Sequence, residues 1–253
     1  MKNNYILCYN LNGWCPVSRK LSYEQKIRNF AGYVQEVYGE PTVIMLQEVL
    51  AGRNQKFLNL IRTLFSGYEA ITPVFDYDTH WKSLLCITLI RKDAIQAYAV
   101  KEFDSELPNR INYVVADIDG EEYHYINTHI VQTVNFRNQA AWFIEDRKRM
   151  HEQQWDLLIT EAKKNRESNL IIGGDLQEAT SGNHITELVE AGYSVLPTHH
   201  ATVKNAFFGT NDHIDQIIFS PNACSKMKPV AVFVDNNQVG VWSDHALIYA
   251  ACS

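Results

Sequence analysis

The 253-residue chain has few of the features that mark membrane proteins, disulfide-rich secreted proteins or general polyanion binders. Its longest uncharged apolar run, LLCITLI at residues 84–90, is far too short to cross a bilayer. Its five cysteines are an odd number without C-x-x-C spacing, so neither a disulfide framework nor a structural zinc site is indicated. The net charge of −6 provides no overall positive field, which leaves only a local basic groove as a means of binding nucleic acid.

The sequence also lacks any stretch with the composition of a linker. Hydrophobic residues make up 46% and charged residues 21%, which is typical of a globular protein, and the length predicts one large domain, residues 1–253. The N-terminal stretch MKNNYILCYNLNGW is interrupted by asparagine and has no small-residue cleavage site, which argues against a signal peptide. Together with the cysteine usage, this predicts a cytoplasmic protein. The oligomeric state is left open, with a monomer plausible.

Strands are predicted wherever short runs are rich in β-branched and aromatic residues. These runs cover residues 5–10, 42–47, 84–90, 113–118, 123–129, 170–174, 214–220, 229–234 and 245–250. Apolar residues at helical spacing predict a helix after Ser22, where Gln25 completes a capping box. Further helices are predicted at about 53–66, 137–165 and 183–191.

The order of these elements indicates the fold class. Helices separate the early strands, but none is expected between residues 84 and 129, where DIDGEEY at 117–123 predicts a hairpin turn. A purely parallel sheet would need a helix at almost every crossover. The sequence therefore predicts an α/β fold in which mixed sheets pack together with helices outside.

Polar residues stand at the ends of several apolar strands. They are Asn10 and Asn12 after the first strand, Glu48 after the second, His129 at the end of 123–129, Asp175 after 170–174, Asp215 near the start of 214–220, and Asp244 with His245 at the start of the last strand. The rims of packed sheets can bring such residues into one pocket. Taken singly, Glu48 fits a solvated strand end, Asp175 after two glycines fits a turn or helix cap, and Asp215 fits an exposed strand start.

Taken jointly, these residues predict a particular chemistry. Carboxylate and amide oxygens without thiolates are the ligands that suit Mg²⁺ or Mn²⁺. Hydrolysis of a phosphoester also needs one group to activate water and another to neutralise the developing charge, roles that Asp and His commonly fill. The set is therefore sufficient for metal-dependent hydrolysis of a phosphoester.

Six segments in this order, YNLNGW, VIMLQEV, YINTHI, IIGGDLQ, HIDQIIFS and WSDHA, resemble the endonuclease/exonuclease/phosphatase superfamily. This superfamily includes pancreatic-type deoxyribonucleases, abasic-site endonucleases, neutral sphingomyelinases and inositol polyphosphate 5-phosphatases. The resemblance covers nearly the whole chain and implies a deoxyribonuclease-like four-layer sandwich, two packed mixed β-sheets flanked by helices. It also implies a divalent-metal-dependent hydrolase of phosphoester bonds.

The resemblance assigns the metal ligands first. Glu48 of LQE corresponds to the main metal ligand, Asp244 to a further acidic ligand, and Asn10 to a residue close to the metal or phosphate, with Asn12 nearby. Mg²⁺, or alternatively Mn²⁺, is the implied cofactor. A phosphoester, with DNA as one candidate, is the implied substrate.

The catalytic roles follow from the same resemblance. His245 corresponds to the histidine that contacts the phosphate, Asp215 to the carboxylate that orients and charges it, and Asp175 to the residue that positions or deprotonates the attacking water. His129 resembles a second histidine of the deoxyribonuclease, sphingomyelinase and 5-phosphatase branches, which abasic-site enzymes typically lack. Gln177 departs from the family's asparagine and lengthens that amide by one methylene.

The substrate is left open between three classes. For DNA the candidate contacts are Arg137, Arg147, Lys148, Arg149, Trp81, Trp142 and Trp242, although the basic residues equally fit a solvated helix face. For a lipid head group the candidates are Phe207 and Phe208 in the segment 199–213, and for a small phosphoester they are Lys82, Arg91 and Lys204. A nuclease is the leading prediction. A phosphatase or phospholipase C-type enzyme is the alternative, and a non-catalytic binding module has only Gln177 in its support.

Overall fold

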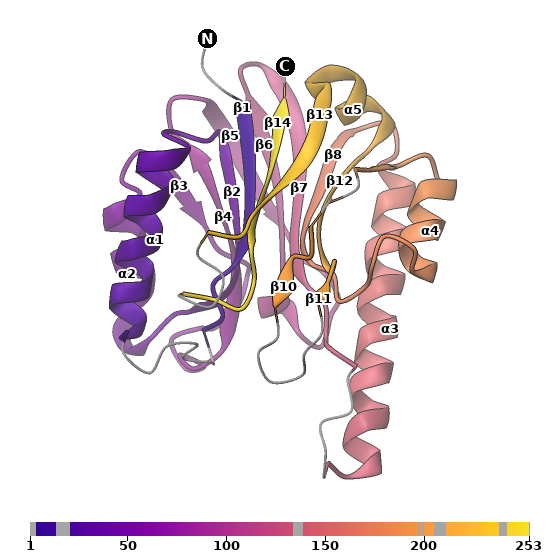
Figure 1. Ribbon diagram of the computed structural model, residues 1–253, viewed down its shortest axis with the longest axis horizontal. Coiled ribbons are helices and arrows are strands. Elements are labelled where there is room, and N and C mark those ends of the chain that lie inside the picture. The colour runs from indigo at the N-terminus through magenta and orange to yellow at the C-terminus, as the bar shows by residue number, and fades with distance from the viewer. Residues whose placement is uncertain are drawn as a thin grey trace.

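Two mixed six-stranded sheets form the centre of the computed structural model, which describes residues 4–13, 21–133, 139–196, 198, 200–204, 211–237 and 242–252 (Figure 1). The first sheet has, in spatial order, β13 (Pro229–Asp235), β14 (Leu247–Cys252), β1 (Asn4–Asn10), β2 (Val43–Leu50), β4 (Leu84–Arg91) and β3 (Tyr68–Ile71). In this sheet β1 and β2 are parallel, and the other neighbours are antiparallel.

The second sheet has the order β5 (Ile95–Lys101), β6 (Ile111–Ile118), β7 (Glu121–His129), β8 (Asn169–Asp175), β12 (Asp215–Phe219) and β9 (Ser194–Val195). Here β7 and β8 are the parallel pair. A short ribbon of β10 (Val203–Lys204) and β11 (Asn211–Asp212) lies apart from both sheets. The hairpin predicted at 117–123 joins β6 to β7, and its central residues Asp119 and Gly120 have the positive φ angles that a tight hairpin turn requires.

Helices cover the outer face of each sheet (Figure 1). On one side lie α1 (Tyr23–Val37) and α2 (Lys56–Leu64), and on the other lie α3 (Ala141–Lys164) and α4 (Asn183–Glu190). The helix α5 (Pro221–Met227) follows β12, and single 3₁₀ turns occupy Arg53–Gln55 and Pro108–Arg110. Helix α1 begins at the predicted capping box of Ser22 and Gln25.

Three apolar clusters lie between these four layers. Alternation along β1 shows the arrangement, because Leu7 and Tyr9 pack beneath α1 and α2 while Ile6 and Cys8 face the second sheet. A third cluster joins the second sheet to α3 and α4 around the fully buried Trp155. The predicted α/β sandwich of two packed mixed sheets flanked by helices is confirmed.

Several sequence-based boundaries were wrong. The last strand begins at Leu247 rather than at His245. Just before it, the Ser243 hydroxyl donates to the Asn10 carbonyl and accepts from the His245 N–H, so bonds to a side chain take the place of regular ladder bonds. Strands β3 and β5 and helix α5 were not predicted. Strand β5 is an edge strand with mostly exposed side chains, so it leaves no apolar run in the sequence.

Other boundaries shifted at helix ends. The helix predicted from about 137 begins at Ala141, and residues 134–138 lie outside the described part of the chain. The helix predicted at 53–66 is a 3₁₀ turn followed by α2. In the ranges that the structure describes, no helix is long and apolar enough to cross a membrane.

Candidate active site

The predicted site residues come together at one rim of the two sheets. His129 and Asp175 end the parallel strands β7 and β8 and lie opposite each other, while Asp215 begins the antiparallel strand β12 and lies opposite Asp175. Asn10 ends β1 in the other sheet, and its Nδ2 donates to Asp175 Oδ2 at 3.0 Å. This hydrogen bond joins the rims of the two sheets directly.

Gly174 allows the close approach that sets His129 beside Asp175. A Cβ atom at this position would lie 1.8 Å from the Thr128 carbonyl oxygen, which is too close for any residue other than glycine. The second glycine of the IIGGD segment therefore has a steric reason to be glycine. It lets the end of β8 lie against β7 just before the two polar residues.

Glu48 leaves the regular ladder of β2. The pairing of β2 with β4 shifts register between Leu46 and Val49, and Glu48 has φ 53° inside this bulge. The Tyr23 hydroxyl accepts from the Leu50 N–H at 3.0 Å and lies 3.4 Å from the Glu48 carbonyl, so it bridges the interrupted ladder. The bulge brings the carboxylate to the rim, where Glu48 Oε1 lies 3.6 Å from His129 Nε2. A strained backbone at a polar rim residue is common at functional sites.

A buried amide pair, which the sequence reasoning missed, locks the two rims behind these residues. Gln47 Nε2 donates to Asn127 Oδ1 at 2.6 Å, and Asn127 Nδ2 donates to the Leu46 and Ile87 carbonyls at 3.1 and 2.8 Å. Gln47 and Asn127 belong to different sheets and are fully buried. Their positions inside LQE and INTH were the available signal, because each stands within two residues of a predicted site residue.

His245 is held between two carboxylates. Its Nδ1 lies 3.1 and 3.0 Å from the two Asp215 oxygens, and its Nε2 lies 3.6 Å from Asp175 Oδ2. Burial acts to lower the pKa of His245, but the charges of Asp215, Asp175 and Asp244 outweigh burial and raise it to about 10. The ring is therefore an imidazolium at neutral pH.

Asp175 is the most connected carboxylate of the site. It accepts from Asn10, from Gln177 Nε2 at 2.6 Å and from the Gln177 N–H at 3.3 Å. Burial raises its pKa to about 7, His245 opposes the rise, and the charges of Asp215 and Glu48 add to it. A carboxyl group with this pKa can exchange a proton near neutral pH. The Gln177 amide folds back onto Asp175 from a backbone with φ 54°.

His129 differs from His245 in charge. It is buried, and burial together with the positive charges of Arg110, His245 and Arg147 holds its pKa well below the ordinary value. Its ring is therefore neutral at neutral pH, although Nε2 lies 3.6 Å from both Glu48 Oε1 and Asp175 Oδ2. A neutral imidazole can either donate or accept one proton from Nε2, depending on its tautomer.

At this rim, two sets of donors could hold a metal ion. Donor atoms of Asp175, Asp215 and His245 lie within 4.8 Å of one another, but a protonated imidazole has no lone pair to offer a metal. Glu48 fits better, because burial and the charge of Asp244 raise its pKa, which marks a carboxylate whose charge the protein does not fully balance. Asn10 hydrogen-bonds Glu48, and the charge of Asp244 acts on it, so the residues predicted to bind the metal interact with one another. Their carboxylate and amide oxygens are of the type that suits Mg²⁺ or Mn²⁺.

The segment before α1 supports Asp244. Asn12 Nδ2 donates to Asp244 Oδ1, and the ammonium of the buried Lys26 binds the Leu11 and Asn12 carbonyls at 3.0 and 2.8 Å. Asp244 is the most exposed carboxylate of the site, with a side chain 29% exposed. Asn12 thus contacts Asp244, one of the residues predicted to bind the metal.

Two arginines flank His129, and sequence reasoning missed Arg110 entirely. Arg110 Nη1 donates to the His129 carbonyl at 3.3 Å, and Arg147 Nε donates to the Gln132 carbonyl at 2.7 Å. Both are partly buried, and neither forms an ion pair with a carboxylate within the described ranges. Arg147 therefore does not belong to a solvated helix face. Guanidinium groups that have no carboxylate partner among the described residues and lie beside a site are suited to binding phosphate oxygens.

The other residues predicted to contact a substrate differ in their exposure and in their partners. Trp242 is buried against Tyr33 in the core. The guanidinium of Arg91 is paired with Asp93 and donates to the Glu40 carbonyl. Trp142 is exposed, and Trp81 is partly buried. The side chain of Lys204 and the residues Arg137, Phe207 and Phe208 lie outside what the structure describes.

No family model matches this chain, and no curated protein matches its sequence. Solved structures do share its fold. The endonuclease/exonuclease/phosphatase from Bacteroides vulgatus has a TM-score of 0.73 at 14% identity, with 100% of this chain and 99% of that chain covered. The AP endonuclease from Archaeoglobus fulgidus has a TM-score of 0.71 at 14% identity, with 99% of each chain covered. TDP2 from D. rerio, complexed with a single-strand DNA product, has a TM-score of 0.69 at 15% identity over 100% of both chains. The predicted deoxyribonuclease-like fold, a sandwich of two mixed sheets flanked by helices, is therefore confirmed.

Proposed function

We propose that this protein is a divalent-metal-dependent phosphodiesterase that cleaves nucleic acid. The observation that carries the proposal is the continuous chain of contacts Asp215–His245–Asp175, which Asn10 and His129 extend to Glu48 across the two sheets. This chain joins a protonated imidazole, a carboxyl group that titrates near neutral pH and an oxygen-rich donor set. These are the three components that hydrolysis of a phosphoester needs.

In the proposed reaction Glu48, Asp244 and Asn10 hold Mg²⁺ or Mn²⁺. When bound, the ion neutralises charge on the phosphate as a Lewis acid. Asp175 accepts the proton of the attacking water, because its raised pKa makes it basic enough near pH 7 and Asn10 and Gln177 fix its direction. Gln177 thus acts by positioning Asp175, in place of the family's shorter amide.

The two histidines have separate roles in this proposal. His245, kept positive by Asp215, stabilises the negative charge that develops on the phosphate oxygens. His129, kept neutral by burial and its cationic neighbours, hydrogen-bonds the leaving oxygen. The difference in charge between two imidazoles in one site is the basis for assigning them different tasks.

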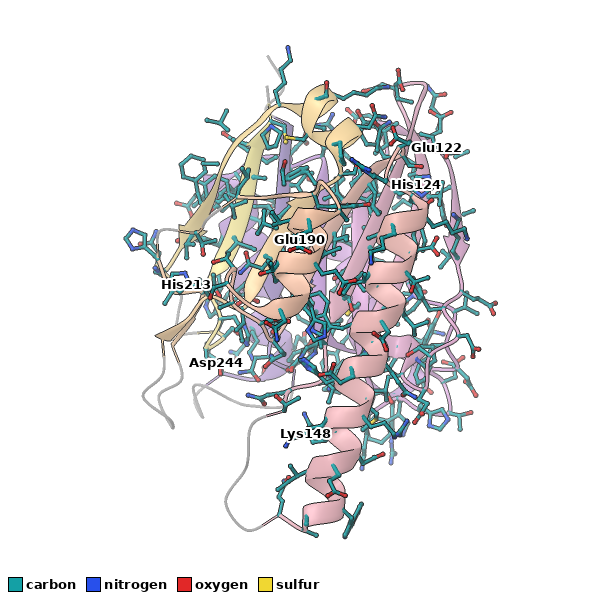
Figure 2. All side chains as sticks on the ribbon, turned by 90° about the vertical axis from the view of Figure 1, so that its right-hand side faces the viewer. Glu122, His124, Lys148, Glu190, His213 and Asp244 are labelled. Carbon is teal, nitrogen blue, oxygen red and sulfur yellow. The ribbon has the colours of Figure 1, made fainter. Side chains whose placement is uncertain are left out.

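DNA is the favoured substrate because the positive and aromatic groups lie on the side of the site where a strand could extend. Figure 2 shows Asp244 and Lys148 at the same end of the molecule. Lys148 lies on the part of α3 that extends beyond the sheets. Trp142, in the first turn of α3, is 70% exposed and can stack on a base. The structural neighbour TDP2 from D. rerio was solved with a DNA product.

Hydrolysis of bis-p-nitrophenyl phosphate tests the enzyme assignment. With Mg²⁺ or Mn²⁺ the wild type should cleave it, and His245→Ala should lose about 100-fold or more of kcat/KM. The variant His80→Ala, at an exposed histidine, is the matched control and should retain full activity. Equal background rates in wild type and His245→Ala would contradict the enzyme assignment and support a binding module.

A substrate panel tests the subclass. Plasmid DNA, sphingomyelin and inositol phosphates should be compared in the same buffer with Mg²⁺, and with EDTA to remove the metal. Cleavage of the plasmid that EDTA abolishes is the expected result. An intact plasmid alongside cleavage of a lipid or a small phosphoester would replace the nuclease assignment with a phospholipase C-type or phosphatase one.

A further inference from the structure

A second group of metal-ligating side chains lies outside the catalytic network. His151 in α3, Glu178 after β8 and His184 in α4 have donor atoms within 4.8 Å of one another. They come from the two helices that cover the second sheet, which Figure 2 shows side by side, and from the connection between β8 and α4. The three side chains are buried or partly buried.

His151 is held in the form that a metal ligand requires. It is 7% exposed, and its Nδ1 lies 2.7 Å from the Val131 carbonyl oxygen. A carbonyl only accepts, so the proton of a neutral ring is on Nδ1 and the lone pair is on Nε2. Metal-binding histidines typically donate their second ring nitrogen to such a partner, which fixes both the tautomer and the ring orientation.

His184 is oriented from three sides. Its Nδ1 lies 2.7 Å from Glu178 Oε2, its Nε2 lies 3.2 Å from Glu152 Oε2, and its ring stacks on Trp155 at 4.9 Å and 4°. The ring of His151 meets it edge-on at 5.9 Å. Glu178 is fixed as well, because its Oε1 accepts from the His184 N–H at 3.1 Å. The rings and the carboxylate are therefore ordered before any ion arrives.

We propose that His151, Glu178 and His184 form a second metal site, for Zn²⁺ or a transition-metal ion of similar preference. Two imidazoles and one carboxylate are a common zinc donor set, whereas the oxygen donors of Glu48 and Asp244 suit Mg²⁺. The ion takes the place of the proton between His184 Nδ1 and Glu178 Oε2, and that proton is released to solvent. Glu152 remains the partner of His184 Nε2, as outer carboxylates are for metal-binding histidines.

Zinc binding requires the donor atoms, which lie within 4.8 Å of one another, to adjust to tetrahedral spacing. Zinc–ligand distances of about 2.0 to 2.1 Å in a tetrahedral site place ligand atoms roughly 3.3 Å apart. The Nδ1–Oε2 distance of 2.7 Å must therefore open by about half an ångström. A water molecule completes the coordination.

The ion would link α3 to the connection that leaves the catalytic rim. Glu178 directly follows Gln177, whose amide holds Asp175 at 2.6 Å. Fixing Glu178 against α3 restricts the backbone on which Gln177 depends. The second metal ion thus holds in place the residues that position Asp175. Its donors, two imidazoles and a carboxylate, differ from the oxygen donors of the proposed Mg²⁺ site.

Zinc binding to the full chain tests this inference without any measurement of catalysis. Isothermal titration calorimetry should be performed with ZnCl₂ on the double variant Glu48→Gln, Asp244→Asn, which removes the carboxylates of the proposed catalytic metal site. One zinc equivalent and a buffer-dependent heat from proton release are expected. Co²⁺ should give the visible absorption of tetrahedral coordination, and excess Mg²⁺ should not displace the zinc.

Substitution of the ligands completes the test. In the same background His151→Gln and Glu178→Gln should each weaken zinc binding at least tenfold, and zinc should no longer raise the Tm by several degrees. Glu122→Gln, which removes the exposed carboxylate of the His124–Glu122 pair, is the charge-matched control and should bind normally. If His151→Gln fails to fold, Glu178→Gln decides, because its side chain is partly exposed.

The inference is wrong if zinc affinity in Glu178→Gln equals that of its background, or if the double variant binds no zinc. Both outcomes are separable from the proposed function, because Mg²⁺-dependent hydrolysis by wild type is measured independently. A failure of catalysis with zinc binding intact would overturn the phosphodiesterase proposal and leave this site in place.

Discussion

The Asp215→Asn substitution should change the charge of His245 and, through it, the pH dependence of catalysis. Asp215 contacts His245 Nδ1 with both carboxylate oxygens, and it is the neighbour that contributes most to raising the pKa of that ring to about 10. The rise from 6.5 corresponds to about 5 kcal/mol in favour of the imidazolium. Asparagine removes the charge and keeps the shape, so the pKa should fall back toward its ordinary value.

The sign of the effect follows from the direction of this shift. In the wild type His245 keeps its proton up to about pH 10. The interaction of this imidazolium with its carboxylates therefore adds fully to the free energy of unfolding below pH 6.5, and this contribution is lost as the pH rises through about 10. In Asp215→Asn the proton is lost near neutral pH, where burial opposes the charge. The rate at pH 8 should therefore fall by about 10²- to 10⁴-fold and recover in part as the pH is lowered.

Two measurements check this reasoning. The pH profile of kcat/KM on bis-p-nitrophenyl phosphate should show its basic limb moving from about pH 10 toward neutrality. The ring nitrogen chemical shifts of His245 in a ¹⁵N NMR titration should move in parallel. The variant Asp78→Asn, at an exposed aspartate, is the control. An unchanged basic limb in Asp215→Asn, or an imidazolium that persists at pH 9, would refute the assigned role of Asp215.

Two further substitutions examine packing and substrate binding. Gly174→Ala should lower the free energy of unfolding by about 3 kcal/mol, because its Cβ would clash with the Thr128 carbonyl, whereas Gly32→Ala in the exposed face of α1 should raise it by about 0.5 to 1 kcal/mol. Urea unfolding measures both, and equal effects would contradict the steric argument. Arg147→Ala should raise the KM for DNA about tenfold and reduce the salt dependence of binding, while Arg149→Ala, whose guanidinium is paired with carboxylates, should not. Identical kinetics on DNA for the two variants would remove Arg147 from the substrate site.

Local patterns determined the secondary structure and the chemistry of the rim. Apolar runs identified the buried strands of both sheets, because a strand covered on both faces must be apolar along its length. The Ser22 capping box marked the start of α1 for an equally local reason. The rim residues were recognisable only as a set, because each one alone also fits a solvated strand end, a helix cap or a turn, whereas carboxylates and imidazoles at the ends of several apolar strands together indicate one site. Edge strand β5 left no such pattern, since its side chains are mostly exposed.

Only the tertiary structure decided which of these residues touch and in what charge state. The register of β7, β8 and β12 places Asp175 between His129 and Asp215, and the bulge in β2 turns Glu48 toward them. The register of a strand and the position of a bulge depend on pairing between strands that lie far apart in the sequence. A short stretch of sequence therefore does not reveal either of them.

The residues that sequence reasoning missed are likewise recognisable only from contacts in the folded protein. Arg110 and the Gln47–Asn127 bridge act through contacts across the fold, and His151, Glu178 and His184 come from separate segments without a recognisable spacing. The charges of His129 and His245 also depend on the tertiary structure, because burial and neighbouring charged side chains set their pKa values. The sequence by itself therefore determined the buried strands and the polar residues that end them, while three-dimensional proximity decided which side chains meet and how they are protonated.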